Sequence, residues 1–162
     1  MTKVYSDDLD LQQKILNGVN KLADNVAATL GPKGRNVILT SKGKRPIVTK
    51  DGVTVANFVD LEDPTENAAA QILKQAASQT NTLAGDGTTT STVLARDILK
   101  NSQRYLTAGA SPVELKRGID KAAKEVSRLI SVAAKPVNDA QDIENIATIS
   151  ANGDKAIGAM IS

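Results

Sequence analysis

Apolar residues recur every three or four positions in one long stretch near the start of the chain, and this pattern constrains the fold more than any other feature. Side chains at this spacing lie on one face of an α-helix. The capping residues Ser6, Asp7 and Asp8 precede the stretch, and Gly31-Pro32 ends it. A long amphipathic helix is therefore predicted. Its apolar positions are Leu11, Ile15, Leu16, Val19, Leu22, Ala23, Val26 and Leu30.

Later segments have helical signals as well. Asp63-Pro64 begins a second helix, a third begins in residues 88–90, and the capping box Ser111-Pro112-Val113-Glu114 begins a fourth. Lys135-Pro136 breaks the fourth helix, and a short helix is expected over residues 140–149. Asp154 then caps the start of another apolar face. The apolar positions expected in the second and third helices are Ala68, Ile72, Leu73 and Ala76, and Val93, Leu94, Ile98 and Leu99.

Two short apolar segments, residues 36–39 and 46–49, predict strands that flank a polar turn. Aromatic residues make up only 2% of the chain. The core must therefore be built from Ala, Val, Ile and Leu, which suits closely packed helices. The predicted fold class is mainly α, with long helices and one small β-hairpin.

The chain contains neither cysteine nor histidine. This excludes disulfides, thiol catalysis, serine–histidine triads and zinc sites built on Cys or His, so any metal must be a hard ion held by oxygens. The net charge of +2 does not indicate a nucleic-acid partner. No apolar run approaches the roughly 20 residues of a membrane helix, and no signal or transit peptide is recognisable. We therefore expect a cytoplasmic protein without a membrane partner.

The strongest chemical signal is Gly85-Asp86-Gly87-Thr88-Thr89-Thr90. Glycines let a backbone turn tightly beside a ligand, and the free N–H groups of a helix start attract anions. The threonine hydroxyls can donate to phosphate oxygens, and Asp86 can ligate a phosphate-bound Mg²⁺. The alternative is a glycine turn followed by threonines that cap a helix. No Walker A motif occurs in the chain.

Two other glycine-containing turns could belong to the same site. One is Thr29-Leu30-Gly31-Pro32 with the following Lys33-Gly34-Arg35, and the other is Lys50-Asp51-Gly52. Each taken alone is more typical of a helix stop or a solvated turn than of a phosphate site. Three such elements with phosphate- or metal-compatible side chains in one small chain favour a phosphate site.

These elements also resemble group I chaperonins, the bacterial GroEL type and its organelle counterparts. The resemblance runs in register over nearly the whole chain. It implies that residues 1–135 are the first half of an equatorial ATP-binding domain and that 136–162 begin an intermediate domain. The motifs that carry it lie in residues 29–37, 48–53, 84–90, 115–120 and 148–152.

The resemblance implies an ATP site with Mg²⁺, and with K⁺ as a further candidate ion. Asp51 would lie where the attacking water sits, and Asp86 would ligate Mg²⁺. Residues 36–51 and Val4-Tyr5 resemble strands used between neighbouring subunits of a double ring. The nucleotide would be contacted by Thr29, Leu30, Gly31, Pro32, Lys50, Gly87, Thr88, Thr89, Thr90, Ile149 and Ser150.

The chain also departs from the family pattern. It is expected to be truncated before the apical domain, through which family members bind the co-chaperonin and unfolded clients, and to lack the second equatorial half. The helix start at residues 65–70 lacks the family's glycine. A full-length form would couple ATP hydrolysis to protein folding, whereas this chain alone is expected to be inactive. The alternatives are a truncated or split subunit that acts as an assembly module without turnover, and a small nucleotide-binding phosphotransferase.

Overall fold

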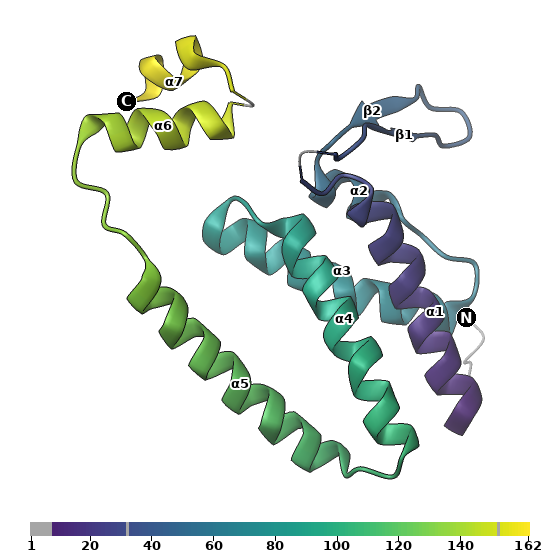
Figure 1. Ribbon diagram of the computed structural model, residues 1–162. Helices are drawn as coiled ribbons and strands as arrows, with labels where there is room; N and C mark the ends of the chain where they lie inside the picture. Colours follow the sequence, from purple (N-terminus) through teal and green to yellow (C-terminus); the bar gives the residue numbers. More distant parts are fainter. Residues whose placement is uncertain (1–7, 32, 152) are drawn as a thin grey trace. The chain divides into compact units, whose positions relative to one another are not determined.

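The computed structural model describes residues 8–31, 33–151 and 153–162. It confirms a mainly α fold with one small antiparallel hairpin (Figure 1). The elements run α1 (Asp8–Ala27), β1 (Val37–Leu39), β2 (Ile47–Thr49), α2 (Gly52–Phe58), α3 (Pro64–Ala84), α4 (Thr88–Thr107), α5 (Pro112–Ala133), α6 (Ala140–Ser150) and α7 (Lys155–Ile161).

The chain forms two compact units, Met1–Ser111 and Pro112–Ser162. The division falls in the turn between α4 and α5, ahead of the break at Lys135-Pro136. The predicted boundary between an equatorial and an intermediate domain after residue 135 concerns the arrangement of a whole subunit and stays a prediction.

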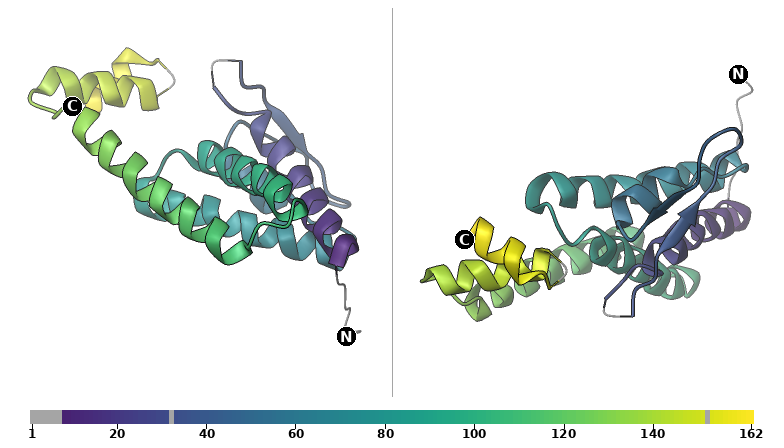
Figure 2. Two further views of the ribbon diagram at one scale, coloured as in Figure 1. Left: turned by 60° about the horizontal axis from the view of Figure 1, so that its bottom comes forward. Right: turned by 90° about the horizontal axis from the view of Figure 1, so that it is seen from above.

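In the first unit, α1 packs on both α3 and α4, and α2 contacts all three of these helices (Figures 1 and 2). The predicted face of α1 is confirmed at Val19, Leu22, Ala23 and Val26, which are all buried, but Leu30 is 42% exposed. Gly18 lets α1 approach α3 closely, since an added Cβ would overlap the backbone carbonyl of Glu66. The helix ends at Ala27, three residues before Leu30.

The apolar face predicted for the second helix is wrong in part. Leu73 is buried, but Ile72 is 68% exposed. The buried side of α3 instead presents Ala69, Ala70 and Ala77. Small side chains fit this face because the helices lie so close together, and a close interface favours alanine over isoleucine. In α4 the buried positions are Thr88 and Thr92, while Leu94 and Ile98, which were predicted to be on the apolar face, are exposed.

The hairpin has the predicted strands, with Ile38 opposite Val48 and Gly43 at φ 77° in the turn. Helix α2 was not predicted, because seven residues are too few to establish a helical period. In the second unit no residue of α5 is buried. Helices α6 and α7 pack on each other through Gly158, where an added Cβ would overlap Thr148 Oγ1. Asp154 caps α7, as predicted.

Candidate functional site

Helix α4 begins without a side-chain cap. Its N-cap residue is Gly87, at φ 82°, and no side chain of the described residues accepts a hydrogen bond from its first turn. Gly85 has a φ of 69°, so both glycines adopt the left-handed backbone that other residues seldom tolerate. The first N–H groups of a helix have no partner inside the helix. The loop therefore presents unpaired donors at the positive end of a 20-residue helix.

A cavity of about 200 Å³ lies at this helix start. It is lined from one side by Thr29, Leu30 and Gly31, which follow α1, and from the other by residues 86–90. The structure thus brings together two of the three glycine-containing elements singled out in the sequence. Pro32, which was predicted to contact the nucleotide, lies outside the described residues.

The two sides of the cavity are tied by a hydrogen bond between threonine hydroxyls. Thr29 Oγ1 lies 3.2 Å from Thr89 Oγ1 and also donates to the Val26 carbonyl at 2.8 Å. A hydroxyl has one proton to donate, so Thr89 must be the donor to Thr29. The proton of the Thr89 hydroxyl is therefore already engaged, whereas the side chain of Thr90 is exposed at the cavity.

The third element joins the site through Gly52, the first residue of α2. Gly52 is buried, and an added Cβ would overlap Thr89 Oγ1 and lie 3.4 Å from Thr88 Oγ1. Any side chain here would push α2 away from α4. The glycine is thus required by the contact between two helix starts.

Asp51 immediately precedes this contact and is the N-cap of α2. Its carboxylate accepts hydrogen bonds from the N–H groups of Val53 and Thr54 and from the Thr54 hydroxyl. Burial raises the pKa of Asp51, but these hydrogen bonds outweigh that effect and hold the pKa below its ordinary value of 3.8. Asp51 is therefore ionised at neutral pH and can orient a donor such as water. Neither Lys50 nor Asp51 lines the cavity itself.

Asp86 is exposed at the mouth of the cavity, and its Oδ1 accepts the N–H of Gly87 at 2.6 Å. Its other oxygen, Oδ2, has no partner within the described part of the chain. Within that part, no three carboxylates gather into a site that would hold a metal by protein ligands alone. The donor set fits a hard ion that takes one oxygen from Asp86 and others from a phosphate.

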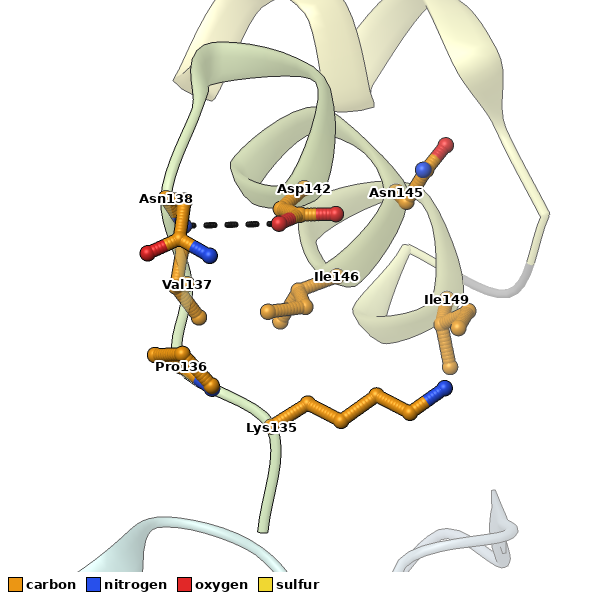
Figure 3. Close-up of a pocket in the computed structure, with 8 residues that line it drawn as sticks. All are labelled: Lys135, Pro136, Val137, Asn138, Asp142, Asn145, Ile146 and Ile149. Atoms are coloured by element: carbon orange, nitrogen blue, oxygen red, sulfur yellow. Dashed lines mark hydrogen bonds between the residues drawn. The ribbon is translucent and has the colours of Figure 1, made fainter.

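Ile149 and Ser150 end α6 in the second unit, so the structure does not place them relative to the cavity. Ile149 lines a separate groove of about 490 Å³, between α6 and the segment 135–138 that leads into it (Figure 3). The apolar side chains of Val137 and Ile146 also line this groove. Asp142 Oδ2 accepts the Asn138 N–H at 3.4 Å across it.

Sequence reasoning missed Thr49 and Thr54, which hold Asp51 from both sides. The Asp51 N–H donates to Thr49 Oγ1 at 3.0 Å, and Thr54 donates to the carboxylate. The available signal was an aspartate with a threonine three residues later, which is the spacing of a helix cap and its third helical residue.

The model of the TCP-1/cpn60 chaperonin family matches residues 22–162. The match includes all three glycine-containing elements and extends through both units. Within residues 8–31, 33–151 and 153–162, none of the helices combines the length and apolarity that crossing a bilayer requires. Because the match covers most of the sequence, this chain belongs to the TCP-1/cpn60 chaperonin family.

Proposed function

We propose that the chain binds ATP with Mg²⁺ at the start of α4. The observation that carries this proposal is the uncapped helix end, which opens into a cavity lined by Asp86 and the threonines. The helix dipole and free N–H groups favour an anion there. A buried Gly52 and the Thr29–Thr89 hydrogen bond hold the three surrounding segments in place.

The residues divide the work by their geometry. The backbone N–H groups of residues 88–90 and the Thr90 hydroxyl bind phosphate oxygens, and Thr89 Oγ1 serves as the tie to Thr29. Asp86 ligates Mg²⁺, which neutralises charge on the phosphates during transfer. Asp51, held ionised, orients the attacking water. Lys50 lies beside it as a further phosphate contact, and K⁺ is a second candidate ion.

In its full-length form we propose that the protein couples ATP hydrolysis to protein folding. Chaperonins of this family assemble into oligomeric rings. The proposal includes a double ring, an apical domain that binds clients and a co-chaperonin, and a cytoplasmic location. It also includes an approach of Ile149 and Ser150 to the nucleotide. Residues 1–135 would then be the first half of the equatorial domain, and 136–162 the start of the intermediate domain.

Replacing Asp86 with alanine in the full-length protein tests the metal assignment. Loss of a charge-assisted contact to a desolvated phosphate or metal commonly costs about a hundredfold in rate. We expect Mg-dependent phosphate release to fall by that factor while the thermal unfolding curve is unchanged. The control is Asp120→Ala on α5, which removes only an exposed ion pair to Lys116. Near-normal turnover in a folded Asp86→Ala protein would refute the assignment.

For the 162-residue chain alone we propose weak nucleotide binding without turnover at a chaperonin-like rate. Leu94 and Ile98 on α4 and the side chains of Val126, Leu129 and Ile130 on α5 are exposed. Such surfaces normally lie against other protein segments. A cavity open to water weakens the charges around it. Phosphate release by the purified chain measures this directly, and rapid release that Asp51→Ala abolishes would contradict it.

The hairpin supports the assembly proposal. Ile38, Ile47 and Val48 are exposed on a two-stranded sheet, and an isolated hairpin is only marginally stable. We propose that it pairs with the edge of another subunit, with residues 4–5, outside the described residues, as the partner strand. Deletion of residues 2–6 should reduce the oligomer mass seen in sedimentation without reducing helicity. An unchanged oligomer would contradict this pairing.

A further inference from the structure

The carboxylate of Asp51 is bound more firmly on one oxygen than on the other. Oδ2 accepts the Thr54 N–H at 2.8 Å and the Thr54 hydroxyl at 2.5 Å. Oδ1 has only a long contact of 3.3 Å from the Val53 N–H. Each carboxylate oxygen has about two acceptor sites. Oδ2 is therefore fully engaged, and Oδ1 has capacity left for another donor.

The other aspartate caps show that capping alone does not require the hydroxyl of Thr54. In α7, Oδ1 of Asp154 accepts two backbone N–H groups. In α3, Oδ1 of Asp63 does the same. Among the described caps, only the one at α2 adds a side-chain hydroxyl, and it does so one residue away from the contact between Gly52 and Thr89.

We propose that Thr54 is a positioning residue whose hydroxyl locks the Asp51 carboxylate, so that Oδ1 is the oxygen that accepts a hydrogen bond from the attacking water. This proposal rests on the proposed function, in which Asp51 orients that water. The Thr54 hydroxyl occupies Oδ2 and prevents the carboxylate from rotating about its last bond. The backbone bond from Asp51 to Thr49 fixes the same residue from the other side. In-line attack depends on such fixed geometry.

Burial raises the pKa of Asp51, and the hydrogen bonds from Thr54 and Val53 together outweigh that effect. Lys50 and Asp86 are exposed, and neither forms an ion pair within the described residues. Elsewhere in the first unit, Lys21 pairs with Glu66, Arg96 pairs with Asp24, and Lys74 donates a hydrogen bond to the Val59 carbonyl.

The test compares Thr54→Val and Thr54→Ala, which lose the hydroxyl, with Thr54→Ser, which keeps it. Partners that orient a functional side chain typically contribute about 10- to 100-fold. In the full-length protein we expect kcat for ATP to fall about tenfold in the first two variants, with KM nearly unchanged, and to recover in Thr54→Ser. The matched control is Thr65→Val at the start of α3, where the threonine donates only its backbone N–H to the cap.

A second readout needs no nucleotide. In the 162-residue chain, NMR titration of the Asp51 carboxyl carbon should show a raised pKa in Thr54→Val and Thr54→Ala, and a pKa near that of the wild type in Thr54→Ser. Unchanged kcat in all three variants of an active enzyme, or an equal loss in Thr54→Ser, would overturn the positioning role alone. Absence of ATP turnover in the wild-type full-length protein would instead overturn the proposed function, and with it the role of Asp51.

Discussion

The helices α2 and α4 start side by side, but the free N–H groups of their first turns are treated differently. At α2, the Asp51 carboxylate accepts the first N–H groups. At α4, Gly87 provides no side chain, and the first turn opens into a cavity. Asp63, Asp139 and Asp154 cap α3, α6 and α7 as Asp51 caps α2. Under the proposed function, an external anion takes the place of the missing cap at the start of α4.

The contact between the two helix starts is the first feature to break. Gly52→Ala would place a methyl group on Thr89 Oγ1. Overpacking of this kind typically costs about 1–3 kcal/mol, so we expect chemical denaturation to show that loss, together with weaker nucleotide binding. In the control Gly118→Ala on α5, the added methyl meets nothing within 4 Å, and the helix should gain up to about 1 kcal/mol. A neutral Gly52→Ala would show that the two helix starts do not need to touch.

Making α4 resemble α2 is the second test. Residue 87 has space for a side chain, since an added Cβ would lie 3.7 Å from Thr80 Cγ2, and Asn and Asp tolerate its left-handed backbone best. Gly87→Asp adds a charge that repels phosphate, whereas Gly87→Asn adds the same shape without the charge. We expect calorimetry to show nucleotide affinity about tenfold lower in Gly87→Asp than in Gly87→Asn, which corresponds to about 1.4 kcal/mol. Equal affinities would place the anion elsewhere.

Removing the cap of a capped helix should lower stability and leave nucleotide affinity unchanged. Asp63→Ala leaves two N–H groups of α3 unpaired and loses the ion pair to Lys14. Loss of an N-cap typically costs about 1 kcal/mol, so the free energy of unfolding should fall by that amount while nucleotide affinity is unchanged. A loss of affinity without a loss of stability would reverse the roles assigned to the two kinds of helix start.

Acid should lower the free energy of unfolding through the aspartate caps, by less than the substitutions above. The backbone hydrogen bond from Glu66, and then the bond from Lys14, lower the pKa of Asp63 in the folded chain. The pKa of Asp51 is also lowered, to below its ordinary value of 3.8. A carboxylate with a lowered folded pKa stabilises the fold above its unfolded pKa, and that stability is lost as the pH falls through the folded value. Denaturation midpoints should thus be flat from pH 7 to 5 and decline below about pH 4. In Asp63→Ala the decline should be shallower.

The sequence predicted most helices because their caps and apolar periods are local signals. Asp63-Pro64 and Asp154 mark real helix starts, whereas α1 ends at Ala27, before the predicted stop at Gly31-Pro32. The face of α3 was mispredicted because α1 and α3 approach each other closely where Gly18 meets Glu66, and such a close contact favours alanine. These two residues are 48 positions apart in the sequence. Neither segment alone therefore reveals the contact.

The candidate site was predictable to the same extent. Its glycines and threonines occur in local sequence motifs, and the cavity brings together two of the three glycine-containing elements. The contact of Gly52 with Thr89 and the bond from Thr54 to Asp51 depend on helix α2, which is too short to predict from periodicity. The direction of the hydrogen bond between Thr89 and Thr29 was also not predictable, because it depends on the bond from Thr29 to the Val26 carbonyl.

Backbone NMR of the ¹⁵N-labelled chain during titration with Mg-ADP tests the central claim most directly, because weak binding is still visible in amide shifts. If the start of α4 holds the phosphates, the largest saturable shifts will be those of the Thr88, Thr89 and Thr90 amides. The N–H groups of Ala156 and Ile157, which Asp154 already caps in α7, will remain unchanged. Saturable shifts elsewhere with none at residues 88–90 would contradict the account.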